Sequence, residues 1–187
     1  MKDPGEIVAK SVLFVVLTLA AGTDLRHRRI PNALILSGLS AFLFVTALAF
    51  FLPQTASLPQ AISPQTILPP TTLTSKVIWM RGWKVLTSRL AAGGAGFFLH
   101  WLPYVLGGMG AGDVKLALVI GLLLGWAPWW TFVGSYCFVL ACVLLWLFAL
   151  GKRRPKRLPL APSMTAAYYL YLLSPYFSSL LPLLFPR

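Results

Sequence analysis

Long apolar runs separated by short polar segments fill most of the chain, and this pattern predicts transmembrane helices. A helix needs about 20 apolar residues to cross a hydrocarbon core about 30 Å thick. Six stretches approach that length, at about 7–23, 31–52, 85–106, 114–126 with an extension to about 130, 130–150 and 162–183. The predicted fold class is therefore an all-α membrane protein, a polytopic bundle of six transmembrane helices.

One long segment breaks the pattern. Residues 53–75 are rich in Pro, Thr, Ser and Gln and include Pro53, Pro59, Pro64, Pro69 and Pro70, so they cannot form an uninterrupted helix. We expect an extramembrane loop over about 53–83. No internal repeat and no soluble domain is visible, and we expect residues 1–187 to form a single transmembrane domain. Within the third stretch, the small residues at 91–96 predict close packing against a neighbouring helix.

Composition agrees with a membrane protein. Hydrophobic residues make up 58% and charged residues 11% of the chain, with a mean hydropathy of +0.78, whereas soluble domains have about 25% charged residues. The net charge of +12 comes from short cationic clusters between apolar runs, which is how membrane proteins set their orientation. We therefore expect membrane lipid, and no nucleic acid, as a partner.

The cationic clusters also predict an orientation. The densest clusters are 26–29 and 152–157, and they fall on the same side of the predicted bundle, which we assign to the cytoplasm. Lys152 to Arg157 would contact anionic headgroups, with a protein of an assembly machinery as the alternative partner. In either orientation, residues 24 and 113 reach the same membrane face.

Acidic residues are scarce, and two of them stand out. The chain has four: Asp3 and Glu6 are expected to be ordinary terminal charges, whereas Asp24 and Asp113 each border a long apolar run. An ionised Asp at the centre of a membrane helix costs about 2.5–3.5 kcal/mol on insertion scales. Taken singly, Asp24 could pair with a nearby arginine, and Asp113 could cap a helix or pair with Lys115. Their common face favours a shared site.

The contexts of these two residues carry further information. Asp24 precedes Ile30, Pro31 and Asn32 in the segment DLRHRRIPN, and Asp113 follows four glycines in GGMGAGDVKL, residues 107–116. The glycines permit positive φ angles and a close approach by another chain. Together with the late segment PLAPSM at 159–164, these motifs resemble the signatures of type IV prepilin peptidases, the GxGD-type aspartic endopeptidases of bacterial inner membranes.

The resemblance implies a function and a set of site residues. It implies a multi-pass inner-membrane protease that removes a short basic leader from prepilins or pseudopilins at the cytoplasmic face, and a role beside the pilus assembly machinery. Asp24 and Asp113, on the first and fourth helices, would be catalytic, and neither metal nor cofactor is needed. Residues that would bind substrate or shape the site are Gly110, Gly112, Pro31, Asn32 and Lys115. The chain lacks the insert with paired CxxC motifs of longer members, so we expect a short form without N-methyltransferase activity.

Four other residues invite functional interpretations that we set aside. We expect His27 to face solvent or headgroups and His100 to take part in interfacial packing, although an ionisable residue within a membrane helix is a functional candidate. Cys137 and Cys142 have no Cys or His partners nearby, so we expect small core-like side chains and no disulfide or zinc site.

Two other classes of function stay open at this point. A small proton- or cation-coupled transporter would use Asp24 and Asp113 as ion ligands, but two related halves with paired broken helices are missing. A non-catalytic membrane scaffold for pilus assembly would keep the fold without its chemistry.

Overall fold

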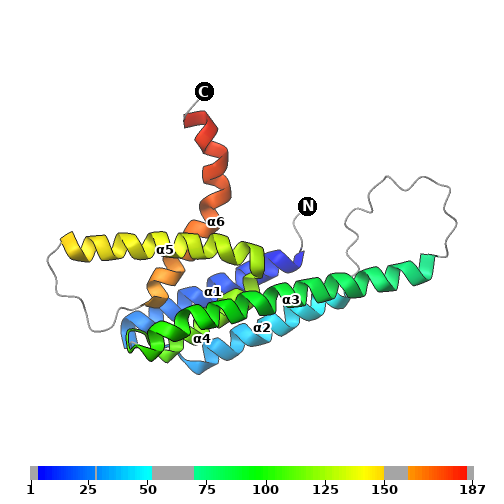
Figure 1. The fold of residues 1–187 in the computed structure, drawn as a ribbon, viewed down its shortest axis with the longest axis horizontal. Coiled ribbons are helices and arrows are strands. Elements are labelled where there is room, and N and C mark those ends of the chain that lie inside the picture. Colours follow the sequence, from blue (N-terminus) through cyan, green and yellow to red (C-terminus); the bar gives the residue numbers. More distant parts are fainter. Residues whose placement is uncertain (1–3, 28, 52–69, 150–159, 185–187) are drawn as a thin grey trace.

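The computed structural model describes residues 4–27, 29–51, 70–149 and 160–184, and all its elements are helices. Their bounds, in chain order, are α1 Pro4–His27, α2 Asn32–Phe51, α3 Pro70–Val105, α4 Ala111–Leu124, α5 Trp126–Ala149 and α6 Leu160–Leu184. Helices α1 to α4 lie lengthwise beside one another, while α6 rises steeply away from them (Figure 1). The predicted all-α class is confirmed for the described residues.

Membrane-spanning helices are only partly indicated. By length and composition, Gly5–His27 and Trp126–Ala149 could each cross a membrane, and Asn32–Leu48 is a shorter apolar helix. These findings cover the described part of the chain. A membrane-spanning bundle of six helices therefore stays a prediction.

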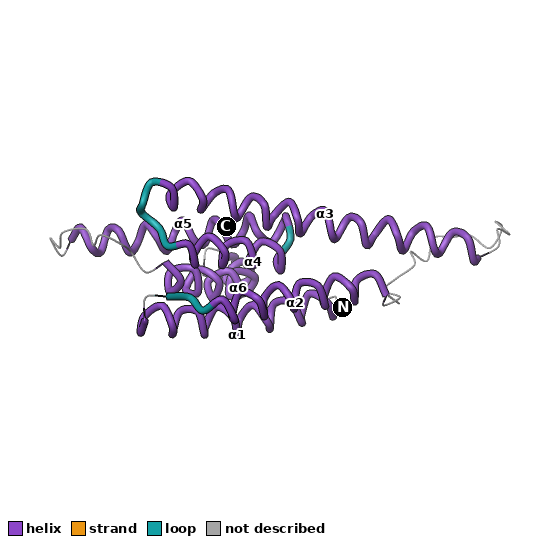
Figure 2. Tube along the Cα trace, turned by 90° about the horizontal axis from the view of Figure 1, so that it is seen from below, coloured by secondary structure: helices purple, strands orange, loops and turns teal. Residues whose placement is uncertain are grey.

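Helix α3 corrects the predicted loop at 53–83. It begins at Pro70, so residues 70–83 are helical, and its N-terminal part extends beyond the other helices (Figure 2). Proline is tolerated in the first helical turn because its missing N–H would have had no intrahelical partner there. Pro70 thus begins a helix instead of interrupting one. Residues 52–69 lie outside the described residues.

The turn between α4 and α5 also differs from the expectation. The predicted boundary lay at about 126–130, but the turn is at Gly125, which has a φ of 79° and donates its N–H to the carbonyl of Gly121 at 2.9 Å. Pro128 falls in the first turn of α5, where it is tolerated. Trp129 and Trp130, near the predicted boundary, therefore lie inside α5, with their ring centroids 4.9 Å apart.

The closest packing in the molecule joins α3 to α4. A Cβ atom built on Gly96 would lie 2.6 Å from the carbonyl oxygen of Ala117, and one built on Gly121 would collide with the carbonyl of Ala92. Glycine lets the two backbones approach to a distance that any side chain would prevent. The predicted role of the small residues at 91–96 is confirmed.

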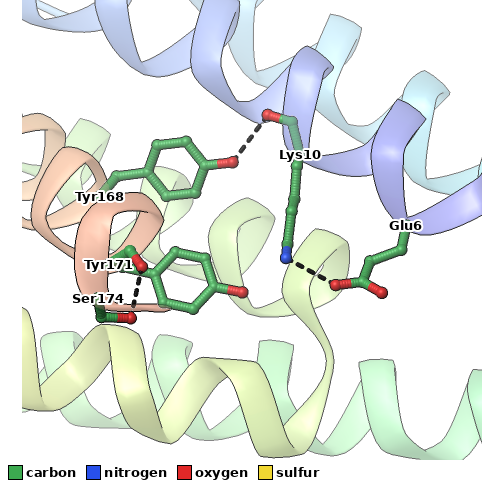
Figure 3. Close-up of polar contacts among 5 residues, drawn as sticks. All are labelled: Glu6, Lys10, Tyr168, Tyr171 and Ser174. Carbon is green, nitrogen blue, oxygen red and sulfur yellow. Dashed lines mark hydrogen bonds and ion pairs between the residues drawn. The ribbon is translucent and has the colours of Figure 1, made fainter. Parts of the chain in front are cut away.

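Polar contacts join α6 to α1 far from Asp24 (Figure 3). The Tyr168 hydroxyl donates to the carbonyl of Lys10 at 2.7 Å, and the Lys10 ammonium lies 5.4 Å from the centroid of the Tyr171 ring. Lys10 also pairs with Glu6 at 2.6 Å. Glu6 is therefore a member of this link, not only the terminal charge expected from sequence.

Two glycines of α3 provide a matched test of the α3–α4 packing. Gly96→Ala should lower the free energy of unfolding by about 1–3 kcal/mol, because the new methyl group would press on the α4 backbone. Gly94→Ala has no atom within 4 Å of the new methyl group, and should be neutral or stabilise by about 0.5–1 kcal/mol, since Ala is the better helix former. Thermal unfolding in detergent measures both, and equal stabilities would contradict the packing described.

Candidate active site

Asp113 lies in the first turn of α4 and is 7% exposed. Its Oδ2 accepts a hydrogen bond from the backbone N–H of Gly110 at 3.2 Å, while its own N–H donates to the Gly110 carbonyl at 3.1 Å. In a capping box, the side chain of the third helical residue bonds to the N-cap N–H, and this bond is present here. The second bond needs an N-cap side chain, which Gly110 does not have. The carboxyl therefore caps its helix, as the simpler interpretation of the sequence proposed.

Asp24 lies near the C-terminal end of α1 and is 8% exposed, although Leu25, directly after it, is 67% exposed. Arg26 and His27, in the last turn, are both exposed. The exposure of His27 agrees with the expectation for that residue. The C-terminal end of α1 and the N-terminal end of α4 lie at the same end of the bundle (Figure 1), so both carboxyl groups belong to one region.

A close approach at Gly112 joins the two motifs. A Cβ atom on Gly112 would lie 3.1 Å from the Cβ of Ile30, in the connection between α1 and α2. Next to this contact, the Lys115 ammonium donates to Oδ1 of Asn32 at 3.3 Å. Lys115 therefore contacts the start of α2 and does not pair with Asp113. The absence of a side chain at Gly112 lets the segment after Asp24 reach the segment that carries Asp113.

The remaining predicted site residues have structural roles in the same region. The carbonyl of Pro31 accepts the N–H of Leu34 at 3.1 Å and so begins α2. Gly110 has a φ of −86°, and in this glycine-rich turn the positive φ occurs at Gly107 instead. Within the GxGD motif, Gly112 allows the close approach of Ile30, and the Gly110 N–H bonds to the Asp113 carboxyl group. The positive φ angle expected in this turn occurs at Gly107, outside the motif.

The two carboxyl groups act on each other electrostatically. Burial raises the pKa of Asp113 to about 6, the Gly110 N–H opposes that shift, and the negative charge of Asp24 adds to it. Asp113 precedes the apolar stretch predicted from residue 114, at the mouth of the helix. An acid that keeps its proton to near-neutral pH beside a second carboxyl group is the arrangement that general acid–base chemistry needs.

Two buried polar residues near Asp113 were missed at the sequence level. His100 is 5% exposed, and its Nδ1 lies 2.9 Å from the Gly96 carbonyl, which identifies Nδ1 as the donor. Its ring centroid lies 5.7 Å from that of Tyr136, whose phenol is in electrostatic range of Asp113. His100 is packed inside the described helices against Tyr136, and its place relative to a membrane interface stays a prediction. The available signal was its spacing of four residues from Gly96, which places both on one face of α3.

No metal site is visible among the described residues, where no three His, Cys, Asp or Glu side chains gather to hold an ion. Cys137 and Cys142 are free and exposed, which corrects the expectation of core-like side chains. The buried face of α5 runs through Trp129, Phe132 and Tyr136, and neither cysteine lies on it.

Mutual action of the carboxyl groups can be measured without an activity assay. Asp24→Asn should lower the pKa of Asp113, because the added repulsion of a neighbouring negative charge is removed. The chain has only three aspartates, so selective 13Cγ labelling gives three carboxyl signals to follow by NMR during a pH titration. Glu6→Gln, at the opposite end of α1, is the matched control and should leave the Asp113 titration unchanged. An unchanged titration in Asp24→Asn would show that the groups do not interact.

Comparison with known proteins gives one finding. The family model described as the type IV leader peptidase family matches residues 59–150. The matched region contains α3, α4 and α5, and therefore Asp113 and its glycine-rich turn, while Asp24 lies outside it. No match was found among the curated proteins or among the solved structures. The match shows that this region is similar to type IV leader peptidases, and it supports a protease.

Proposed function

We propose that this chain is a membrane-embedded aspartic endopeptidase that removes the short basic leader from type IV prepilins or pseudopilins. Asp24 and Asp113 are the catalytic pair. The observation that supports this most strongly is that two buried carboxyl groups from distant parts of the chain lie at one end of the bundle and act on each other. Two independent helix caps would not need that arrangement.

The chemistry follows from a pair of carboxyl groups that share one proton. The ionised carboxylate accepts a proton from water, which attacks the carbonyl carbon of the peptide bond. The protonated partner donates its proton to the carbonyl oxygen, and the carboxyl group that took the proton from water then gives it to the leaving amine. The charge of each group affects the other, so the two apparent pKa values belong to the pair, and neither role is assigned to one residue.

A groove between α2 and α4 suits the apolar helix of the substrate. It has a volume of about 460 Å³ and lies between α2 and α4, with Asn32 and Lys115 among its lining residues. Its other lining residues are apolar: Ala33, Ile35, Leu36, Leu39 and Leu118. An apolar helix that continues into a polar leader matches this combination of surfaces, with Asn32 and Lys115 near the cleaved end.

The membrane arrangement completes the proposal. Six helices cross the bacterial inner membrane, with Asp24 and Asp113 at the cytoplasmic face, where the leader of a membrane-inserted prepilin is found. Lipid and the pilus assembly machinery are the further partners. Methylation of the new N-terminus does not belong to this activity, because the paired CxxC motifs of the longer family members are missing from the sequence.

Cleavage of a prepilin tests the proposal directly. The full chain, purified in detergent, should shorten a prepilin by the mass of its leader. Asp24→Asn and Asp113→Asn should each lower the rate by about 10³-fold or more, since residues that act as a unit are each indispensable. Glu6→Gln is the control and should cleave at the wild-type rate, and a chelator should have no effect.

Each outcome of this experiment has a clear meaning. Full cleavage by either Asp variant would refute the catalytic pair. Loss of cleavage on chelation would refute a metal-free reaction. A folded wild-type protein that binds the prepilin without cleaving it would support the scaffold instead.

A further inference from the structure

Tyr136 is a buried polar residue that packing alone does not explain. It is 6% exposed, and its ring stacks on Phe132 with the centroids 6.2 Å apart. Within the described residues, its buried hydroxyl has no hydrogen-bond partner. A phenylalanine would fill the same volume without that cost, because an unsatisfied buried hydroxyl lowers stability. The hydroxyl therefore needs another explanation.

The packing of α3 on α4 shows where this hydroxyl lies. The close contacts pair Ala92 with Gly121, and Gly96 with Ala117. One further turn along the same faces brings His100 opposite Asp113, since residues four apart share a helix face. The His100 ring contacts Tyr136, and the Asp113 charge acts on the Tyr136 phenol. Tyr136 therefore reaches the Asp113 side of the candidate site from α5.

The hydrogen bond and the ring contact of His100 hold the Tyr136 ring in a fixed position. The His100 Nδ1–H is bound to the Gly96 carbonyl, which fixes the ring orientation and the tautomer. The ring then packs against Tyr136 at a tilt of 39°. His100 is thus a positioning residue, because its fixed ring packs against the Tyr136 ring.

We propose that Tyr136 is a further catalytic residue, and that its hydroxyl donates a hydrogen bond to the carbonyl oxygen of the peptide bond being cleaved. This inference rests on the proposed function, and it explains why the hydroxyl has no protein partner: its partner arrives with the substrate. A donor placed before the reaction begins stabilises charge that develops on that oxygen without reorganisation.

The reaction balances without any change in Tyr136. Water attacks the carbonyl carbon while one carboxylate takes its proton, and the π electron pair moves onto the carbonyl oxygen. The second carboxyl group protonates that oxygen as the Tyr136 O–H stabilises it. When the intermediate collapses, the C–N bond breaks and the first carboxyl group gives the proton it took from water to the leaving nitrogen. One O–H of the diol returns its proton to the second carboxylate as the C=O bond re-forms, so both carboxyl groups regain their starting states. Tyr136 keeps its own proton throughout, so it only stabilises and positions the oxygen.

Two tyrosine variants test the inference with full-length protein and a prepilin substrate. Tyr136→Phe should lower kcat by about tenfold to 100-fold with KM changed by less than about twofold, as expected when an interaction made in the transition state is lost. Its melting temperature should not fall, because the hydroxyl has no partner to lose. Tyr168→Phe is the control: its hydroxyl bonds to Lys10 at 2.7 Å, so the variant should melt lower but keep the wild-type kcat.

The possible results separate this inference from the proposed function. Wild-type cleavage with an unchanged kcat in Tyr136→Phe would overturn the inference and leave the proposed function intact. A kcat loss in Tyr136→Phe that accompanies a lower melting temperature, or that Tyr168→Phe shares, would show a structural effect and also overturn it. Failure of the folded wild-type protein to cleave any prepilin would overturn both.

Discussion

Direct backbone contact between α3 and α4 is the constraint on which the rest of the structure depends. A methyl group on Gly96 or Gly121 would collide with a backbone carbonyl of the facing helix, so neither helix can slide or rotate without opening a gap or a clash. This fixes the register of the two helices. In a membrane, lipid is as apolar as the helix surfaces, so the hydrophobic effect does little to select which helices pack together. Close packing of small residues then determines much of the helix pairing. Residues one turn further along, His100 and Asp113, are brought opposite each other as a result.

The candidate site depends on a second close approach of the same kind. Gly112 receives Ile30 from the connection between α1 and α2, and Lys115 bonds to Asn32 just beyond it. The two motifs therefore meet through contacts on both sides of Asp113, and Asp24 reaches electrostatic range of that residue. Burial and like charge both oppose ionisation of Asp113, so the packing that assembles the site also prepares its proton chemistry.

Particular elements show how far sequence reasoning reached. The positions of α1, α2, α4 and α6 followed from apolar length, with ends wrong by a few residues, because helix ends depend on capping contacts that hydropathy does not contain. Proline misled at Pro70, which was read as part of a break although it lies in a first turn where proline is tolerated. The contact of His100 with Tyr136 was not predicted, because it depends on the position of α5, which the local pattern around His100 does not contain.

Sequence by itself determined the helical class, the close packing of the small residues at 91–96, and the choice of Asp24 and Asp113 as the acidic residues to explain. These follow from composition and local pattern, since hydrocarbon penalises isolated charges and favours long apolar helices. Only the tertiary structure decided that the two carboxyl groups lie at one end of the bundle (Figure 1) and that Tyr136 packs against His100. Such relations depend on the register between helices, which is set by contacts between residues far apart in the chain.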